Sequence, residues 1–406
     1  MLTRQGFAAL FAGIAALFVG RVFGVIELYV IGAGFLVATV GSFLFVQARR
    51  PKIEATRWIH PSVLVAGDTG RVDLHLNHRG SVRSTPFELA ETVSRAGAPD
   101  HVARLAVGSL TAGATSTAGY QLPTSVRGII ELGPLQIESR DPLGIARRRA
   151  IVAGLDSVIV APRTSLLEVP QLGQGTLGRL LLIQARRLGP GEFHSLREYV
   201  QGDEPRSIHW KASARSEDLV VKEHTVEGLR RCTVVLDADR KSYRDDAGFE
   251  RAITAAASLV HSADFAGLTT RFVTGGGVDL RGPEVSTNTL RFLARIELNS
   301  EPMGTLERDP GEGLGLLMIV TGTPQGVGLR AAQSMIDPTL TALTVTTDEP
   351  NRSPVGVSAR SEQEFLASWR ALVGIGRLDL ARRADDSSLV DRTDLTATGR
   401  AEPQPA

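Results

Sequence analysis

Residues 233–274 decide the fold of the second half of the chain and read TVVLDADRKSYRDDAGFERAITAAASLVHSADFAGLTTRFVT. The apolar run at residues 233–236 predicts a buried strand that ends at Asp237. Residues 249–265 have the apolar spacing of a helix, and residues 270–274 predict a second strand. A strand, a helix and a strand in this order predict two parallel strands joined by a crossover helix.

The same alternation continues to residue 375. Predicted helices occupy residues 287–296, 325–336 and 362–372, and predicted strands occupy residues 314–321 and 340–346. This order of elements indicates a doubly wound α/β domain over residues 231–375. The polar residues 376–406 are expected to form a disordered tail.

Residues 51–170 have a different pattern, in which short β-rich runs alternate with turn signals. Residues 72–77 alternate between apolar and polar side chains, as a half-buried strand does, and residues 129–132 and 151–160 supply further β-rich runs. Strands at this spacing without long helices predict a small β-sandwich-like domain. Such a domain serves either as a spacer or as a binding surface, and both interpretations stay open.

Residues 1–50 contain two uncharged apolar runs, at residues 6–20 and 28–46. A helix over the second run is ~28 Å long, close to the ~30 Å hydrocarbon core of a bilayer. The first run reaches a spanning length if it continues past Arg21, whose side chain then extends toward the interface. We therefore expect a transmembrane helical hairpin; a cleaved signal peptide and a pair of buried soluble helices are the alternatives.

Positive charge gathers at the outer ends of the two runs. Arg4 precedes the first run, and the second is followed by Arg49, Arg50, Lys52 and Arg57. The positive-inside rule places both outer ends in the cytoplasm. The sequence therefore predicts a multi-pass membrane protein whose soluble region is cytoplasmic.

The composition excludes several classes of protein. The chain has 45 basic and 44 acidic residues, so no global positive field attracts nucleic acid, which we do not expect as a partner. Cys232 is the only cysteine, so an intrachain disulfide and a multi-cysteine zinc site are both excluded. Its place beside the apolar run at residues 233–236 predicts a small buried side chain.

Residues 171–230 form a charged connector, whose densest part, residues 191–224, reads GEFHSLREYVQGDEPRSIHWKASARSEDLVVKEH. Asp203 is expected to cap a helix whose first turn contains Pro205 and which presents Ile208 on one side. Because acidic and basic residues are interleaved throughout, ion pairs between them are expected.

Three interpretations of this connector stay open. The first is a salt-bridged element that docks one domain on the other, with Arg197 forming forked hydrogen bonds to a carboxylate such as Asp203. We expect Arg197, Asp203, Arg206 and Trp210 to be mainly structural. The second is a protein-binding surface, and the third is a catalytic site.

The order of residues in the connector has a recognisable pattern. Its positions are Gly191, Glu192, Phe193, Leu196, Arg197, Tyr199, Gly202, Asp203, Arg206, Ile208, Trp210, Lys211, Ala214 and Arg215. Upstream positions that fit the same pattern are Arg127-Gly128, Leu132-Gly133-Pro134, Asp141-Pro142-Leu143-Gly144 and Val160-Ala161-Pro162-Arg163. Together they resemble the bacterial "domain of unknown function 58" family, and the resemblance covers most of residues 1–345.

The resemblance implies a von Willebrand factor A-like fold for the C-terminal domain and a MoxR-type AAA+ ATPase as a protein partner. With the patterns above, it divides the chain into a transmembrane helical hairpin at residues 1–50, a β-sandwich-like domain at 51–170, the connector at 171–230, the α/β domain at 231–375 and the tail at 376–406. The connector residues expected to form an interface are Glu192, Phe193, Arg197, Tyr199, Gly202, Asp203, Arg206, His209, Trp210, Lys211 and Arg215.

Other motifs lack the context that their usual chemistry needs. Residues 173–178 spell GxGxxG, but no buried strand precedes them, so dinucleotide binding is not expected. His194, His209 and His224 fall on different predicted elements, so they do not predict a zinc site. The sequence contains no Walker phosphate-binding loop and no GxSxG nucleophile elbow.

The resemblance also raises the question of a metal site. Metal-binding von Willebrand A domains carry an Asp-x-Ser-x-Ser loop after the first strand and an Asp after a later strand, oxygen ligands that suit Mg²⁺. Here Asp237 keeps the leading position, but Asp239 and Lys241 replace the two serines. Gly322 stands where the later Asp is expected.

The remaining candidate ligands form a degenerate set, which consists of Asp237, Asp239 and Ser242. We therefore expect no cofactor and no bound divalent metal. In a metal-free loop, Asp237 is expected to be held by Arg240 or Lys241.

Two functions follow from these observations. The leading hypothesis is a membrane-anchored adaptor or assembly factor that binds protein through its von Willebrand A-like domain. The absence of a complete catalytic motif argues against an enzyme. The alternative is an envelope-associated hydrolase whose acid–base groups are Glu192, His194, Asp203 or His209.

Overall fold

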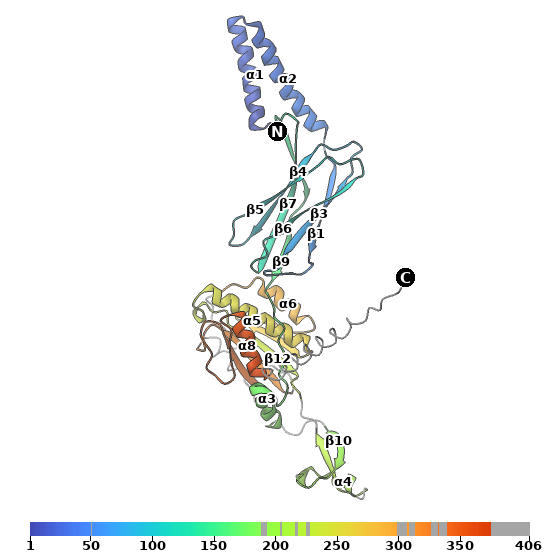
Figure 1. Cartoon of the computed structure of the whole chain (residues 1–406), viewed down its shortest axis with the longest axis vertical. Coiled ribbons are helices and arrows are strands. Elements are labelled where there is room, and N and C mark those ends of the chain that lie inside the picture. Colours follow the sequence, from blue (N-terminus) through green and yellow to red (C-terminus); the bar gives the residue numbers. More distant parts are fainter. Residues whose placement is uncertain are drawn as a thin grey trace, which may run out of the picture. The chain divides into compact units, whose positions relative to one another are not determined.

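The computed structural model divides the chain into two compact units, Met1–Pro162 and Arg163–Ala406, both drawn in Figure 1. It describes residues 1–49, 51–187, 193–203, 205–215, 218–224, 228–298, 307, 313–325, 332 and 339–374. The first unit ends at residue 162, whereas the sequence placed this boundary at residue 170.

The first unit begins with two helices that lie side by side, α1 (Arg4–Phe23) and α2 (Ile26–Ala48). Thr3 caps α1 by accepting a hydrogen bond from the Gly6 N–H. Gly24 turns the chain between the helices in the left-handed conformation, with φ at 69°, a value that favours glycine.

Small residues bring the two helices together. The buried residues of α1 are Gly6, Gly13 and Gly20. A Cβ added to Gly13 would lie 3.1 Å from the Cβ of Phe35, and one added to Gly20 would lie 3.1 Å from the Cβ of Leu28. The close approach therefore uses glycines seven positions apart.

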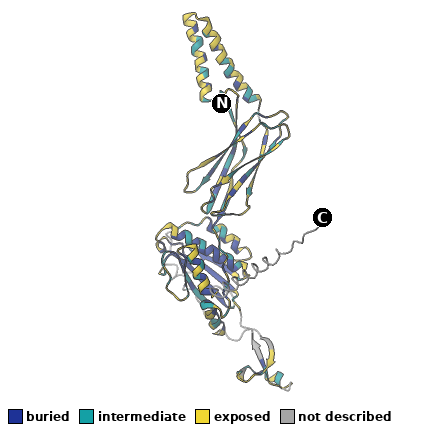
Figure 2. Cartoon of the chain, viewed as in Figure 1, coloured by how far each residue is buried: buried dark blue, intermediate teal, exposed yellow. Residues whose placement is uncertain are grey.

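Both helices are long and apolar enough to cross a membrane. Only 17% of the apolar window in α1 and 22% of that in α2 is buried. Most of their side chains therefore face outward, as Figure 2 shows. A broad outward-facing apolar surface is favourable in a bilayer and unfavourable in water.

The rest of the first unit is built from two sheets. Strands β1 (Ile53–His60), β3 (Gly70–His78) and β6 (Thr115–Leu122) form one antiparallel sheet, in the order β1-β3-β6. The second sheet has the order β2 (Leu64–Val65), β9 (Asp156–Ala161), β7 (Gly128–Arg140), β4 (Phe87–Arg95) and β5 (His101–Val107), with β8 (Arg147–Ala153) also paired to β7.

Alternate residues of these strands fill one core between the two sheets. Val72 and Leu74 of β3 pack in the same cluster as Leu89 of β4 and Ile137 of β7. The alternation at residues 72–77 therefore predicted β3 correctly, and the arrangement is sandwich-like. The run at residues 151–160 is divided between β8 and β9, because the chain turns at Gly154.

A buried ion pair crosses this core. The guanidinium Nε of Arg57 lies 2.6 Å from Glu91 Oε1, and the two side chains are 8% and 1% exposed. The Tyr120 hydroxyl donates to the other carboxylate oxygen of Glu91. Burial and this carboxylate raise the pKa of Tyr120. Arg57 is therefore an interior residue, and counting it among the juxtamembrane charges was wrong.

The second unit contains a mixed sheet. Its order is β14 (Val278–Leu280), β13 (Thr269–Thr274), β12 (Arg231–Leu236), β15 (Gly315–Thr321), β16 (Leu340–Thr346) and β17 (Gly356–Ser358). Strand β14 runs antiparallel to β13, and the other neighbours are parallel. Counted along the chain, this is the order 3-2-1-4-5-6 of doubly wound sheets.

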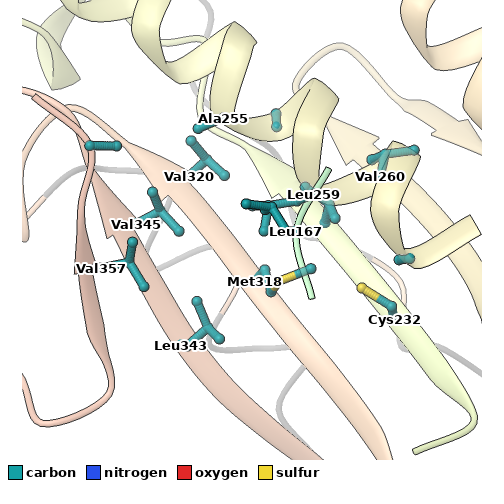
Figure 3. Packing of buried hydrophobic residues seen from close by; sticks show 14 of the residues in the cluster. Leu167, Cys232, Ala255, Leu259, Val260, Met318, Val320, Leu343, Val345 and Val357 are labelled. Atoms are coloured by element: carbon teal, nitrogen blue, oxygen red, sulfur yellow. The ribbon is translucent and has the colours of Figure 1, made fainter. Parts of the chain in front are cut away.

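Helices cover the sheet. Residues of α3 (Gly175–Arg187), α5 (Asp246–Phe265) and α8 (Glu362–Val373) share one core with the strands, and α6 (Val285–Leu293) packs beside α5. In Figure 3, Leu259 of α5 and Leu167 lie over Met318 of β15. Cys232 is 1% exposed in this cluster, so its predicted burial is confirmed.

Helix α3 belongs to this core, although it lies in the segment expected to be a connector. Leu177, Leu181 and Ala185 are buried at the spacing of one helical face. The glycines of the GxGxxG sequence permit close packing there. A Cβ on Gly175 would lie 2.4 Å from the carbonyl of Val373, and one on Gly178 would lie 2.0 Å from the Gln171 carbonyl oxygen.

Two predicted segments lie outside the residues that the structure describes. The helix at residues 325–336 lies outside the described residues, apart from Gln325 and Ala332. The tail at residues 376–406 lies entirely outside them.

Candidate functional site

The carboxyl edge of the mixed sheet has the geometry at which doubly wound folds bind ligands. Strands β12 and β15 are neighbours at the point where the strand order reverses. Asp237 follows β12, and Gly322 follows β15. The two positions that the sequence singled out therefore meet at one place, which we call the switch-point loop (residues 237–243 with residues 321 and 322).

Asp237 is completely buried, and its carboxylate accepts hydrogen bonds from two hydroxyls and a backbone N–H. Its Oδ2 accepts hydrogen bonds from the Ser242 hydroxyl at 2.6 Å and from the Thr321 hydroxyl at 3.0 Å. Its Oδ1 accepts from the backbone N–H of Asp239 at 3.1 Å. Hydrogen bonds from these groups satisfy the buried carboxylate.

The backbone of the loop is fixed by the same kind of contact. Asp239 accepts from the Lys241 N–H and caps a short 3-10 turn, η2 (Arg240–Ser242). The Tyr243 hydroxyl donates to the carbonyl oxygen of Asp237 at 2.6 Å. Burial and the carboxylates of Asp237 and Asp348 raise the pKa of Tyr243 well above its ordinary value. Tyr243 therefore stays protonated and keeps donating at neutral pH.

Gly322 is a glycine for steric reasons. A Cβ at this position would lie 2.1 Å from the carbonyl oxygen of Ser242 and 2.8 Å from the Tyr243 ring. An aspartate at residue 322 therefore does not fit beside this loop unless the loop moves. The close approach links the turn after β12 to the end of β15.

The candidate metal ligands Asp237, Asp239 and Ser242 come together, but in a hydrogen-bonded loop. Among the residues that the structure describes, no three His, Cys, Asp or Glu side chains are grouped so as to hold a metal ion. Arg240, one of the two expected partners of Asp237, forms an ion pair with Asp246. Both are on the exposed side of the loop, where a guanidinium keeps its hydration.

Sequence reasoning missed Thr321, Tyr243 and Asp348 as members of this edge. Asp348 follows β16, and its side chain is 2% exposed. It accepts hydrogen bonds from the Arg244 N–H at 2.7 Å and from the Arg251 guanidinium at 3.1 Å. Its place directly after a parallel strand was the signal that marks such a residue.

The family pattern lies on a separate small element, which we call the arm (residues 193–224). Strands β10 (Phe193–Glu198) and β11 (Val220–His224) pair in antiparallel fashion. Between them lie a 3-10 turn, η1 (Pro205–Ser207), and a single helical turn, α4 (Trp210–Ser213).

The arm does not contain the single helix that was expected after Asp203. Ile208 forms a β-bridge with Val221, and this pairing interrupts the helix between η1 and α4. His209 caps α4, because its Nδ1 accepts from the Ala212 N–H at 2.9 Å. Burial of Ile208 against β11 thus outweighs the local helical preference.

Asp203 and Arg197 form the expected forked pair. The two guanidinium nitrogens lie 2.7 Å from the two carboxylate oxygens, and the Val200 N–H donates to the same carboxylate at 2.9 Å. The Arg197 hydrogen bonds, followed by that from Val200, lower the pKa of Asp203 to about 2. The side chains are 41% and 20% exposed, so this is a surface pair.

The three histidines lie on different elements: His194 on β10, His209 before α4 and His224 on β11. Phe193 pairs with His224 in the strand register. Glu192 lies outside the described residues, as do the side chains of Phe193, His194, Arg206 and His224. Lys211 and Arg215 are exposed, Gly202 lies in the exposed turn and Tyr199 is half-buried.

Large apolar side chains are exposed on the arm. Their exposed fractions are 44% for Leu196, 63% for Val200, 65% for Trp210 and 43% for Leu219. Among the arm residues that the structure describes, Ile208 and Val221 are the buried apolar ones. We call the four exposed residues the arm's apolar surface. Trp210, which was expected to be mainly structural, is one of these exposed residues.

Residues 195–321 match the family described as "Protein of unknown function DUF58". The chain carries a DUF58 region. This match confirms the resemblance that the arm sequence indicated, and it covers the arm from residue 195 and the switch-point loop up to residue 321. No curated protein is similar enough to the chain to be counted as a relative.

Solved structures match short parts of the chain. The alkylpurine DNA glycosylase AlkC of Pseudomonas fluorescens is 12% identical, covers 32% of this chain and 38% of its own, and has a TM-score of 0.21. The CARDB domain of the PF1109 protein of Pyrococcus furiosus, in complex with di-metal ions, is 9% identical. The match covers 28% of this chain and 88% of the CARDB chain, with a TM-score of 0.20. A β-glucosidase from Listeria innocua is 14% identical. The match covers 26% of this chain and 16% of the glucosidase chain, with a TM-score of 0.18. The chain spans well under half of the glycosylase and the glucosidase, and scores this low carry no inference about function.

Proposed function

We propose that this DUF58 protein is a membrane-anchored adaptor or assembly factor that binds another protein through its arm and α/β domain. The observation that carries the proposal is the arm's apolar surface. Several large apolar side chains exposed on one small element with little core of its own are typical of a protein-binding surface. Exposed tryptophan is especially frequent among the residues that dominate binding energy.

The proposed partner is a MoxR-type AAA+ ATPase, and the α/β domain is von Willebrand A-like. The support for the domain type is the 3-2-1-4-5-6 strand order with an antiparallel edge strand. A polar loop at the strand-order switch adds to it. The support for the partner is the family resemblance, since such ATPases accompany members of the family.

The proposed location is the inner membrane of a bacterium, with the hairpin spanning it and the soluble region in the cytoplasm. Arg4 and Arg49 at the outer ends of the helices support this orientation. The test uses a cysteine introduced at Thr396 in a Cys232→Ser background. It should react with a membrane-impermeant thiol reagent only after lysis, and labelling of intact cells would contradict the orientation.

The hydrolase alternative, with Glu192, His194, Asp203 or His209 as acid–base groups, is less well supported. A carboxyl group with a pKa of about 2 is a weak base at neutral pH. The Nδ1 of His209 is engaged by the backbone of α4. Asp203 is therefore not poised to accept a proton at neutral pH, and the contact at Nδ1 leaves only the Nε2 of His209 for such a role.

The partner proposal is tested by co-expressing the full chain with the MoxR-type ATPase and measuring affinity in detergent. Trp210→Ala should weaken binding by about tenfold or more, as expected for a central interface aromatic. Trp58→Ala is the matched control, because Trp58 lies on β1 and is 57% exposed. Equal affinity of both variants and the parent chain would overturn the arm as the docking surface.

A further inference from the structure

The loop before β8 is joined to the start of α1. The Thr3 N–H donates to the Ile145 carbonyl oxygen at 2.9 Å, and the Thr3 hydroxyl donates to that of Gly144 at 2.6 Å. Leu2 forms an antiparallel bridge with Ala146. The segment that leads into α1 therefore continues the edge of the β-sheet, and the two parts of the first unit meet there.

This loop has a fixed shape. Asp141 accepts hydrogen bonds from the N–H groups of Leu143 at 3.0 Å and Ala146 at 2.6 Å. A Cβ on Gly6 would lie 2.1 Å from the Ile145 carbonyl oxygen, so the loop touches the backbone of the first turn of α1. This contact gives a physical reason for the Asp141-Pro142-Leu143-Gly144 sequence that resembles the family pattern.

Basic residues distant in sequence gather at this junction. Arg148 donates a hydrogen bond to Gln47 near the end of α2, so β8 lies beside the end of the hairpin. Within the described part of the chain, no carboxylate forms an ion pair with Arg4, Arg49, Lys52 or Arg147, which are exposed or half-exposed. The neighbouring Glu138 is already paired with Arg140 and Arg149.

An apolar side chain accompanies these charges. Leu143, at the tip of the loop, is 63% exposed, and Pro142 beside it is exposed as well. Phe7, one turn into α1, is 62% exposed. Basic side chains next to exposed apolar ones, at the end of a membrane-spanning hairpin, are typical of residues that lie in the headgroup region of a bilayer.

We propose that this junction binds the headgroups of anionic phospholipids. The binding surface, which we call the basic collar, consists of Arg4, Arg49, Lys52 and Arg147, with Leu143 inserted at the level of the headgroups. The proposal rests on the proposed membrane-spanning hairpin, since continuity with the hairpin is what brings the collar to the bilayer. Basic clusters beside a transmembrane helix attract anionic lipids through the negative surface potential.

The insertion of Leu143 is tested with the full chain in nanodiscs. A nitrobenzoxadiazole probe is placed on Leu143→Cys in a Cys232→Ser background. The matched control is Val63→Cys, because Val63 is 66% exposed and follows the far end of β1. The probe at residue 143 should emit at shorter wavelength and be quenched by headgroup-level spin-labelled lipid, and the probe at residue 63 should show neither change.

The charge contribution is tested by the association of spin-labelled phosphatidylglycerol relative to phosphatidylcholine. The parent chain should prefer phosphatidylglycerol by about twofold or more. Combined substitution R49Q, K52Q and R147Q should remove the preference. The control neutralises three arginines of the second unit, R291Q, R352Q and R360Q, and should keep it.

The outcomes separate this proposal from the one on which it rests. Extraction of the chain by alkaline carbonate would overturn the membrane-spanning hairpin and the collar together. A chain that resists extraction, but has identical probe spectra at residues 143 and 63 and no lipid preference, would overturn the collar alone.

Discussion

Two aspartates of the DUF58 region are held in opposite ways. Asp237 at the switch-point loop is fully buried, and its carboxylate accepts hydrogen bonds from two hydroxyls and a backbone N–H. Asp203 on the arm is partly exposed, and its partner is the Arg197 guanidinium. A buried carboxylate depends on every donor around it, whereas an exposed ion pair exchanges its partner for water at little loss.

The difference indicates that the switch-point loop maintains the fold, whereas the arm is built to contact a partner. At the switch-point loop, polar groups bind one another and join the turn after β12 to the end of β15. On the arm, polar groups shape a small element while apolar side chains stay in solvent. Substitutions at the loop should therefore change stability, and substitutions on the arm should change binding.

The largest expected change in stability is the one caused by Asp237→Ala. It leaves the Ser242 and Thr321 hydroxyls and the Asp239 N–H without their buried acceptor, which destabilises the α/β unit by about 3–5 kcal/mol. Urea unfolding followed by Trp369 fluorescence, in a Trp58→Phe and Trp210→Phe background, reports on this unit, because Trp369 is 4% exposed within its core.

The matched control for this substitution is Asp246→Ala. Asp246 is in the same region of the chain, but its side chain is 83% exposed, so its loss should change stability by less than about 0.5 kcal/mol. Equal effects of the two substitutions would contradict the structural role of Asp237.

A smaller loss is expected from Gly322→Ala. The added Cβ would lie 2.1 Å from the Ser242 carbonyl oxygen, and relief of such a contact typically destabilises by about 1–3 kcal/mol. The control is Gly228→Ala, where an added Cβ meets nothing within 4 Å. A Gly322→Ala chain as stable as its parent would show that the loop is free to move.

Much of the fold could be predicted from local patterns. The strand–helix alternation predicted β12, β13, β15 and β16, which are short apolar runs, and α5 and α8, which are longer and have helical periodicity. Strands β14 and β17 are short, spanning Val278–Leu280 and Gly356–Ser358, and carry too few residues for a pattern. Helix α3 was missed because its surroundings are charged, although Leu177 and Leu181 mark a buried face.

The site could be predicted only in part. Asp237 was recognisable because it follows a buried strand, but its partner Thr321 is 84 positions away, and only the parallel pairing brings the two together. The role of Arg57 was misjudged for a similar reason. Its charge is paired with Glu91 of a different strand, a contact that no local pattern contains.

On the arm, Arg197→Gln should change a pKa and leave stability almost unaltered. The pKa of Asp203 should rise from about 2 toward the ordinary ~3.9. Because the folded pKa is depressed, any stability it contributes is present above about pH 4 and lost as the pH falls toward 2. Carboxyl-carbon NMR, assigned with Asp203→Asn, measures the shift.

The melting temperature of Arg197→Gln at pH 7 should stay within about 1 °C of the parent, since exposed ion pairs contribute little to stability. A fall of several degrees would mean that the pair is buried by a contact in solution. That result would revive the interpretation of the arm as a docking element between domains.

The smallest effect is expected from adding a divalent metal ion, which should not bind to the switch-point loop. Calorimetric titration of the full chain with Mg²⁺ or Mn²⁺ should show no saturable binding tighter than about 1 mM, a range that weak oxygen-ligand sites reach. The Ser242 and Thr321 hydroxyls donate to Asp237, Asp239 accepts from the Lys241 N–H, and a side chain at residue 322 would collide with Ser242. A metal would have to break these bonds and recruit ligands from elsewhere. Stoichiometric binding that disappears in Asp237→Asn, with the fold intact by circular dichroism, would contradict this prediction and turn the switch-point loop from an architectural element into a metal-dependent docking site.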